Sequence, residues 1–315
     1  MSKILLSGVK PTGRPHIGNY FGAMKQFVDL QKDHKCYFMI VDYHALNSVQ
    51  NKSEMSENIL NVALDYLAIG LDPEKSVIFK QSDVPEHTEL TWIFDTITTM
   101  PYLMRAHAFK DAEAKNKEIS VGTFNYPMLM AADILLYDTD IVPVGQDQKQ
   151  HVEITRDTAE KFNRIYGETF KLPEEYIVKN LATVPGTDGH KMSKSYKNTI
   201  PLFATDEEIQ KSVMSIVTDS SGELPQNVYA IHSLFRSKSD LESIYEEHKG
   251  KYKALKEVLI EDIKAFIDPL RKRREALAQD MEKVKEILLI GGKKARSEAS
   301  KKMKDVREKI GVSIY

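Results

Sequence analysis

The residues near the amino terminus that are best suited to chemistry form a loop rich in glycine and proline, residues 10–22 (Lys-Pro-Thr-Gly-Arg-Pro-His-Ile-Gly-Asn-Tyr-Phe-Gly). An apolar run at residues 4–6 precedes it, and apolar residues at helical spacing follow it in residues 23–30. The loop therefore joins a buried strand to a helix, at the strand end where open α/β sheets bind ligands. Free N–H groups at the helix start, Gly18 and Asn19, favour a phosphate. A plain strand-to-helix turn is the alternative, and the loop matches neither the dinucleotide nor the Walker pattern.

A lysine-bearing segment further along the chain carries a second set of groups that suit phosphate chemistry. Residues 185–195 begin with turn formers and end in Lys-Met-Ser-Lys-Ser. Lys191 and Lys194 stand three residues apart, accompanied by the hydroxyl groups of Ser193 and Ser195. Two ammonium groups and two hydroxyls on one loop make a cationic clamp for a polyphosphate. A chance arrangement on a surface rich in Lys and Ser is the alternative interpretation.

Asp133 is the one charged residue in an otherwise apolar segment, residues 125–136. Helical spacing places Tyr126, Met130 and Asp133 on the same face, at positions i, i+4 and i+7. Pro127 suits the first turn of a helix, so we expect the helix to begin close to it. A buried carboxylate needs a hydrogen-bond donor or stays protonated, at a cost of several kcal/mol. The donor is either a ligand or a Lys or Arg of the protein.

Four short apolar runs predict the strands that position these groups: residues 4–6, 36–41, 77–80 and 140–144. Helical stretches separate them, as in the mononucleotide-binding half of a doubly wound fold. We therefore predict an α/β fold with a parallel, Rossmann-type catalytic domain. His44 follows the second strand, and a polar loop with Gly145, Gln146 and Asp147 follows the fourth, so these residues point to the same crevice. Asp147 is placed to accept ribose hydroxyls.

Composition excludes several classes of protein. The chain has 315 residues, enough for two domains, with 42% hydrophobic residues and a net charge of −2, as in an ordinary soluble protein. No apolar run approaches the roughly 20 residues that a membrane span requires, and the first residues do not resemble a signal peptide. Cys36 is the only cysteine, so the chain can form neither an intrachain disulfide nor a cysteine-based metal site. We expect a cytoplasmic protein.

The carboxyl-terminal part differs from the rest in charge and in pattern. Residues 249–315 carry 19 Lys and Arg against 11 Asp and Glu, a net charge of +8, whereas residues 1–248 have a net charge of −10. Apolar residues keep helical spacing in this part, and Gly291-Gly292 is expected to separate two helices. A basic helical region indicates contact with a polyanion, and a solvated helical face is the alternative.

Two of these motifs occur in the order and context typical of one enzyme family. His16-Ile17-Gly18-Asn19 resembles the His-Ile-Gly-His motif of class I aminoacyl-tRNA synthetases, and residues 191–195 are their full Lys-Met-Ser-Lys-Ser motif. Asparagine in the last place of the first motif is typical of the tryptophanyl-tRNA synthetases. The resemblance to that family extends over nearly the whole chain and includes residues 41–45, 126–133 and 134–151 and the helical end.

The resemblance implies a function and a set of site residues. Members of this family activate L-tryptophan with ATP, release pyrophosphate and transfer the tryptophanyl group to tRNA(Trp). By resemblance, the catalytic residues are His16, Asn19, Lys191 and Lys194. The residues around ATP are Lys10, Pro11, Thr12, Gly18, Asn19, Gly145, Gln146, Asp147, Ala182, Lys191, Met192, Ser193, Lys194 and Ser195. The residues around tryptophan are Asp133, which accepts the indole N–H, and Tyr126, Met130, His44, Gln148, Val142 and Val144.

The resemblance also implies partners and a domain organisation. The family uses Mg²⁺, held mainly by the ATP phosphates. We expect no structural metal in this chain. We expect a homodimer that binds L-tryptophan and tRNA(Trp), with neither a membrane nor DNA as partner. Residues 1–195 form the expected catalytic domain, with a helical dimerisation insertion at about 85–140 and a mobile loop at 186–195, and residues 196–315 form an α-helical anticodon-binding domain. Trp92, in the insertion, is assigned to the core or to the subunit interface rather than to a ligand.

Two positions depart from the family pattern. Lys10 stands where members usually carry Gln or Asp, and Gln146 where they often carry Glu, so Lys10 adds a positive charge where the ATP phosphates would lie. A tyrosyl-type synthetase is the nearest alternative, but it carries Gln where Met130 stands, and methionine suits a wide apolar ring such as indole. A synthetase paralogue without catalytic activity and a small-molecule nucleotidyltransferase of the same fold are further alternatives.

Overall fold

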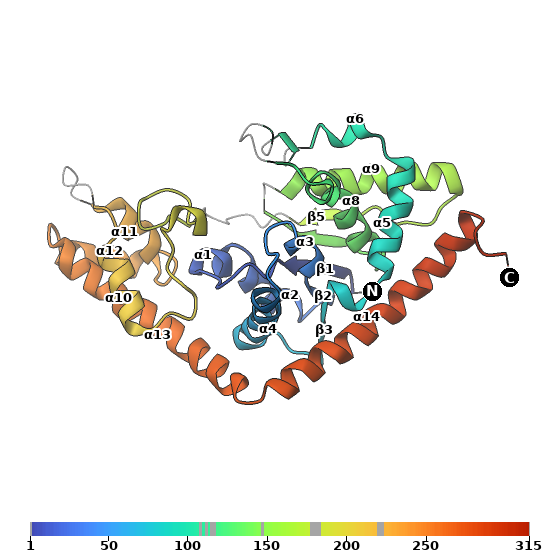
Figure 1. The fold of residues 1–315 in the computed structure, drawn as a ribbon. Helices are drawn as coiled ribbons and strands as arrows, with labels where there is room; N and C mark the ends of the chain where they lie inside the picture. Colours follow the sequence, from blue (N-terminus) through green and yellow to red (C-terminus); the bar gives the residue numbers. More distant parts are fainter. Residues whose placement is uncertain are drawn as a thin grey trace.

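The computed structural model describes residues 2–106, 109–110, 113, 118–145, 148–176, 184–218 and 224–314 (Figure 1). Its strands form one parallel five-stranded sheet in the order β3-β2-β1-β4-β5. The strands are β1 (Ile4–Val9), β2 (Lys35–Ile40), β3 (Ser76–Lys80), β4 (Ile141–Pro143) and β5 (Glu174–Tyr176). This order is that of a doubly wound sheet, so the predicted α/β, Rossmann-type fold is confirmed.

Helices cover both faces of the sheet because successive strand residues point to opposite sides. One hydrophobic core contains Leu5, Cys36, Phe38 and Ile78, and the other contains Leu6, Tyr37, Met39 and Phe79. The first core is closed by α2 (Lys25–Leu30), α4 (Lys52–Ile69), α10 (Asp206–Met214), α11 (Gln226–His232) and α13 (Tyr252–Ala278). The second is closed by α5 (Glu86–Ile97), α8 (Val121–Leu135) and α9 (Lys149–Tyr166).

Shorter helices complete the described chain. They are α1 (Ile17–Asn19), the π-helical η1 (Tyr20–Met24), α3 (Asp42–Ala45), the 3₁₀ turn η2 (Gln81–Asp83), α6 (Met100–Leu103), the 3₁₀ turn η4 (Lys194–Tyr196) and α12 (Lys238–Glu247). In the described part of the chain, no helix combines the length and apolar character that crossing a membrane requires.

The register of the central strands brings three chain segments to one edge. Val9 of β1 pairs with Ile40 of β2, and Ile40 pairs with Lys80 of β3. The residues that follow each strand therefore emerge side by side: the loop from Lys10, helix α3 and the turn η2. This edge is the one at which parallel sheets place their ligands.

Two details of the sequence prediction are wrong. Helix α8 begins at Val121, where the Ser120 hydroxyl accepts the Thr123 N–H, so Pro127 lies inside the helix rather than in its first turn. The capping side chain, and not the proline, sets the start of this helix. Strand β5 was not predicted, because Glu174–Tyr176 is a short edge strand of exposed and half-exposed residues without an apolar run.

The expected break at Gly291-Gly292 is also wrong. Helix α14 (Met281–Lys309) runs through both glycines without interruption. A Cβ atom at Gly291 would lie 1.8 Å from the carbonyl oxygen of Ile78 in β3, so glycine is required for contact between the helix and the edge strand. Figure 1 shows α14 passing along β3 after meeting α13 at an angle. Val284 and Leu288 of α14 join the first core, and residues beyond the glycine pair join the second.

The basic charge of the C-terminal helices is partly used within the molecule. Ion pairs connect α14 with the acidic body: Arg296 with Glu86 at 3.4 Å, Arg307 with Glu89 at 2.5 Å and Lys302 with Asp138 at 2.7 Å. In α13, Arg274 pairs with the buried Asp65 at 2.6 Å. The opposite net charges of the two parts of the sequence therefore reflect their mutual packing, in addition to any contact with a polyanion.

Trp92 does not belong to the core of this chain. It lies on α5 with 71% of its surface exposed. Of the two structural roles predicted for it, only that in a subunit interface stays open. The division of the chain at residue 195 also stays a prediction, and α14 returns from the helical part to β3 of the sheet.

We predict that Gly291→Ala destabilises the protein by about 2–4 kcal/mol, because the added methyl group would overlap backbone atoms that cannot move alone. Urea unfolding followed by circular dichroism measures this free energy. Gly22→Ala is the matched control: it is also helical, nothing lies within 4 Å of the place its added methyl group would take, and the change should be neutral or stabilising by about 0.5–1 kcal/mol. Equal stability of the two variants would contradict the packing argument.

Candidate functional site

A cavity of about 440 Å³ opens at the carboxyl ends of β1, β2 and β4. Its wall includes all seven side chains that the sequence assigned to the amino acid: His44, Tyr126, Met130, Asp133, Val142, Val144 and Gln148. Most of the remaining lining is apolar, with residues such as Leu6, Phe27 and Met39. The structure therefore brings these residues from α3, α8 and the end of β4 into one apolar space with few polar groups.

Asp133 is 1% exposed, and polar side chains of the protein lie against its carboxylate. The Gln81 Nε2 donates to both carboxylate oxygens, at 2.8 and 3.0 Å, and His44 Nε2 lies 2.9 Å from Oδ2. His87 Nδ1 lies 2.6 Å from Oδ1. Burial by itself would raise the pKa of Asp133, but the neighbouring His87 and His44 outweigh it and lower this pKa to about 2. The protein partners are thus two imidazoles and an amide, in place of the Lys or Arg considered from sequence.

Gln81 and His87 are the residues of this site that the sequence analysis missed. Both are fully buried, at 0% exposure. Gln81 is the first residue after β3, so a polar residue directly after a strand was the available signal. His87 lies in the first turn of α5 and carries no such signal, because only the tertiary structure brings α5 against α8.

Lys10 is the only Lys or Arg among the residues described around the cavity. Its ammonium nitrogen lies 5.5 Å from the centre of the Tyr126 ring, and burial lowers its pKa. No carboxylate in the described part of the chain lies within ion-pair distance of it. The cavity therefore offers a carboxylate, Asp133, and a separate cation to its ligand. The Tyr126 hydroxyl contacts His151 of α9.

His16 and Asn19 hold each other at the start of α1. The His16 Nδ1 accepts the Asn19 N–H at 3.2 Å, and the Asn19 Oδ1 accepts the His16 N–H at 3.0 Å. Burial and the positive charge of Lys194 lower the pKa of His16 to about 4. His16 is thus a neutral imidazole at pH 7, with Nε2 carrying its proton, and Asn19 keeps its amide N–H groups for other acceptors. Both are placed as donors to an anion.

The Lys-Met-Ser-Lys-Ser segment meets the first loop. The Lys194 Nζ donates to the carbonyl oxygens of Thr12 and Gly13, each at 2.9 Å. The backbones are joined as well, through the Ile17 N–H on Ile200 and the Leu202 N–H on Pro15. Two motifs that are distant in sequence therefore form one site.

Asn198 shapes this segment and was also missed. It is 2% exposed, and its Nδ2 donates to the Asp188 carboxylate at 2.7 Å, while its Oδ1 accepts the Ser193 N–H at 2.8 Å. Met192 is buried, whereas Lys191 and Ser195 are exposed. The buried Asn198 side chain thus fixes the turn that carries Lys191 and Lys194 and leaves these lysine side chains accessible.

The other sequence-predicted residues around ATP are placed as follows. Pro11 and Thr12 continue from β1 beside the cavity, and a Cβ atom at Gly18 would lie 3.3 Å from that of Met192, which shows how closely the two loops approach. Gly145 lines the cavity. Gln146, Asp147 and Ala182 lie outside the described residues.

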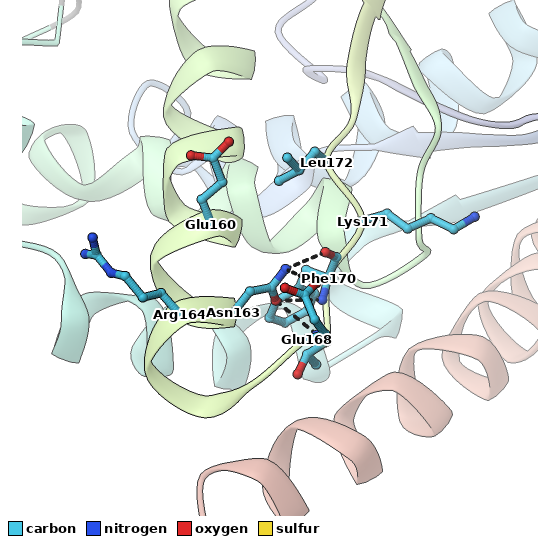
Figure 2. Close-up of a pocket in the computed structure, with 8 residues that line it drawn as sticks. Glu160, Asn163, Arg164, Glu168, Phe170, Lys171 and Leu172 are labelled. Atoms are coloured by element: carbon cyan, nitrogen blue, oxygen red, sulfur yellow. Dashed lines mark hydrogen bonds between the residues drawn. The ribbon is translucent and has the colours of Figure 1, made fainter.

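A second hollow lies between the end of α9 and the loop that leads to β5 (Figure 2). The Asn163 side chain turns toward Phe170, whose N–H and carbonyl it binds at 2.9 and 2.8 Å, while Arg164 and Lys171 point away from it. None of the predicted site residues that the structure describes lines this hollow. Asn163 there holds the loop rather than facing a ligand.

We predict that His16 stays neutral well below the usual histidine range, with a pKa of about 4. Because the folded-state pKa is lower than the unfolded value of about 6.5, its contribution to stability is present above pH 6.5 and is lost as the pH falls toward 4. NMR titration of the imidazole measures the pKa, and Lys194→Met should raise it by removing a positive charge. Lys197→Met is the control; an unchanged His16 pKa in Lys194→Met would contradict the assignment.

The comparisons with known proteins agree with this geometry. Residues 2–289 match the model of the family described as tRNA synthetases class I (W and Y). The tryptophan–tRNA ligase of Fusobacterium nucleatum is 50% identical over 321 residues, which cover 98% of this chain and 99% of the relative. That of Rhodopirellula baltica is 45% identical over 317 residues, with coverage of 98% and 99%.

A solved structure extends the similarity to three dimensions. The tryptophanyl-tRNA synthetase of Campylobacter jejuni, complexed with ADP and tryptophan, superposes with a TM-score of 0.91 at 44% identity, covering 98% of this chain and 99% of that one. The similarity therefore includes the sheet, the two motifs and the C-terminal helices together. The chain belongs to the class I tRNA synthetases for tryptophan and tyrosine and, within them, to the tryptophanyl-tRNA synthetases.

Proposed function

We propose that this chain is a tryptophan–tRNA ligase: it activates L-tryptophan with ATP, releases pyrophosphate and transfers the tryptophanyl group to tRNA(Trp). The observation that carries this proposal is an apolar cavity with the buried Asp133 carboxylate in its wall, next to two loops that present cations and N–H donors. An indole offers one N–H on a wide apolar ring, which matches this distribution of groups.

Activation requires no covalent enzyme intermediate. A carboxylate oxygen of tryptophan forms a bond to the α-phosphorus of ATP, while the bond from that phosphorus to the bridging oxygen breaks and pyrophosphate leaves with the electron pair. The nucleophile is already ionised, so a general base is not needed. The protein contributes position and charge stabilisation.

The two motifs would surround the phosphates. Lys191 and Lys194 bind the departing pyrophosphate, and His16 Nε2–H and the Asn19 amide donate from the other side. Lys194 now donates to the carbonyl oxygens of Thr12 and Gly13, and phosphate oxygens would replace these acceptors. Charge-assisted bonds to phosphate are stronger than those to a neutral carbonyl, so the exchange is favourable.

Mg²⁺ would enter with ATP. The side chains that meet at the two loops are cationic or neutral donors, which suit phosphate oxygens, whereas Mg²⁺ prefers carboxylate, phosphate and water oxygens. In the described ranges, no group of three or more His, Cys, Asp or Glu side chains could hold a metal ion. The phosphates would supply most of its ligands, and the ion would neutralise charge on them during transfer.

The selectivity for tryptophan over tyrosine would reside on α8. Met130 and Asp133 both line the cavity, and methionine packs against a broad ring without offering a strong hydrogen bond. A site that binds a substrate N–H discriminates strongly against analogues that lack it. Gln148, Val142 and Val144 would complete the walls around the ring.

The other assignments complete the proposal. The helical part from residue 196 would read the anticodon of tRNA(Trp), with exposed lysines of α14 such as Lys293, Lys294 and Lys304 available to its phosphates. The exposed Trp92, with Met100 and Met104, would meet a second subunit in a homodimer. Because the proposed reaction supplies aminoacylated tRNA for translation, the protein would act in the cytoplasm.

Amino-acid-dependent exchange of ATP and pyrophosphate tests this function. Exchange with tryptophan alone is the expected result. Exchange with tyrosine would keep the mechanism and overturn the description of the cavity. If neither amino acid supports exchange, the hypothesis of a synthetase paralogue without catalytic activity gains weight.

We predict that Asp133→Asn weakens tryptophan binding by about 10- to 100-fold, because the ligand N–H loses a charged acceptor. Equilibrium dialysis with labelled tryptophan measures the dissociation constant. Asp65→Asn is the matched control, since Asp65 is also a buried carboxylate but pairs with Arg274 outside the cavity. Tryptophan binding as tight as in the unchanged protein would show that Asp133 does not set specificity.

Lys194→Ala should slow adenylate formation by about 10²- to 10³-fold, because one charged contact to the leaving pyrophosphate is lost. Pre-steady-state measurement of adenylate reports this step, and tryptophan binding should stay nearly unchanged. Lys197→Ala tests for a general effect of lost charge on the same loop. Near-normal adenylate formation in Lys194→Ala would refute the assignment.

A further inference from the structure

Three polar side chains of the protein lie against the Asp133 carboxylate in this structure. A carboxylate offers about four lone-pair sites. Gln81 Nε2 donates to both oxygens, at 2.8 Å to Oδ1 and 3.0 Å to Oδ2, and His44 Nε2 lies at hydrogen-bond distance from Oδ2. His87 Nδ1 lies 2.6 Å from Oδ1, in contact with it but without the geometry of a hydrogen bond. Because Asp133 is only 1% exposed, a ligand N–H can approach the carboxylate only from the side that faces the cavity.

The three partners differ in their access to the cavity. His44 lines the cavity, whereas Gln81 and His87 do not and are 0% exposed. The ligand side of the carboxylate is thus the His44 side. Gln81 and His87 lie behind the carboxylate and can influence a ligand only through residues that line the cavity.

Gln81 connects the carboxylate to the element that carries His44. Its Oε1 accepts the backbone N–H groups of Tyr43 and His44, at 3.1 and 3.4 Å, while its Nε2 holds Asp133. Asp42 also connects α3 with η2, since its Oδ1 accepts the N–H groups of Ser82 and Tyr43. One buried amide therefore sets the relative position of α3, η2 and α8.

His87 is supported in turn by the second hydrophobic core, on the same face of the sheet. Its Nε2 lies 2.9 Å from the hydroxyl oxygen of Tyr137, and the Tyr137 ring stacks on Tyr37 of β2 with ring centres 4.8 Å apart. Tyr137 is buried among these rings. The His87 imidazole is thus held between the Asp133 carboxylate and Tyr137, and it cannot rotate without disturbing the packing of the core.

We propose that Gln81 is a positioning residue for substrate selectivity: with His87 behind it, it holds the Asp133 carboxylate so that a ligand N–H enters only from the His44 side. This inference rests on the proposed function, because it assigns the carboxylate to the tryptophan N–H. Gln81 itself does not touch the substrate. Its donor half orients Asp133, and its acceptor half orients α3.

Two substitutions distinguish the role of the Gln81 amide N–H donor from that of its carbonyl oxygen acceptor. Gln81→Met removes donor and acceptor together, and we expect tryptophan binding to weaken by about tenfold or more at every pH, because buried partners lose their bonds. Gln81→Glu keeps an oxygen for the N–H groups of Tyr43 and His44 but replaces the amide donor. When protonated, the new carboxyl group can donate to Asp133 again.

The pH dependence of Gln81→Glu is the decisive measurement. Two adjacent buried carboxyl groups share a proton, and its loss is shifted to higher pH. We expect the dissociation constant for tryptophan, divided by that of the unchanged protein, to rise by about tenfold between about pH 6 and about pH 9.5. The titratable groups facing the new carboxyl group are Asp133, His44 and His87, with Asp42 beyond Ser82.

Gln31→Glu is the matched control. Gln31 is also a buried glutamine, which donates to the carbonyl oxygens of Val28 and Gly70 and accepts the Asp72 N–H, away from the cavity. It should show the stability cost of a buried glutamate, measured by thermal unfolding, with no pH-dependent change in tryptophan binding. A similar pH slope in Gln31→Glu would assign the effect to general destabilisation and overturn the inference.

The outcomes distinguish the inference from the function on which it rests. If the unchanged protein fails to exchange pyrophosphate with tryptophan, the proposed function falls. If it does exchange, but Gln81→Met binds tryptophan normally or Gln81→Glu shows no pH dependence relative to it, the positioning role of Gln81 falls alone. Should Gln81→Met fail to fold, the pH profile of Gln81→Glu still decides.

Discussion

The burial of one ionised carboxylate constrains much of this structure. A carboxylate as enclosed as Asp133 is stable only when donors surround it, because water no longer solvates it. Its polar partners come from three other elements: Gln81 from η2 and His44 from α3 are at hydrogen-bond geometry, and His87 from α5 is in close contact. They meet only because β2 and β3 end in register, so the sheet, the helix positions and the cavity depend on one another.

The C-terminal helix α14 has a comparable structural role at the β3 edge of the sheet. It covers the edge strand β3, which would otherwise expose unpaired backbone groups. The glycine pair allows this close approach, and the ion pairs of Arg296, Arg307 and Lys302 with the acidic body strengthen it. A region whose composition indicates nucleic-acid contact thus also completes the fold of the sheet.

The two loop motifs form a site in which backbone carbonyl oxygens of the protein accept the hydrogen bonds that phosphate oxygens of a ligand could accept. Lys194 donates to backbone carbonyls of the first loop, and His16 is kept neutral by burial and by that same ammonium group. The reciprocal bonds between His16 and Asn19 fix the start of α1 and leave one N–H side of each residue open. The positive charge of the site is therefore carried by the lysines, and the neutral pair His16 and Asn19 supplies hydrogen-bond donors in fixed orientations.

Much of the organisation could be predicted from the sequence, because it depends on local pattern. The apolar runs predicted four of the five strands, since buried parallel strands are continuous in hydrophobicity, and spacing on one helix face joined Tyr126, Met130 and Asp133. The same reason made the motif residues recognisable, because each motif lies within four or five consecutive residues: His16 and Asn19 in one, Lys191 and Lys194 in the other.

Features that depend on contacts between distant segments could not be predicted. The donors Gln81 and His87 were missed because nothing near them in the chain shows that they face Asp133, 52 and 46 positions away. The Gly291-Gly292 pair was misinterpreted because local propensity makes glycine a helix breaker, whereas packing against the Ile78 carbonyl makes it a requirement. The sequence by itself determined which groups could act. Only the tertiary structure decided their partners, because burial and hydrogen bonding depend on what the folded chain places beside each group.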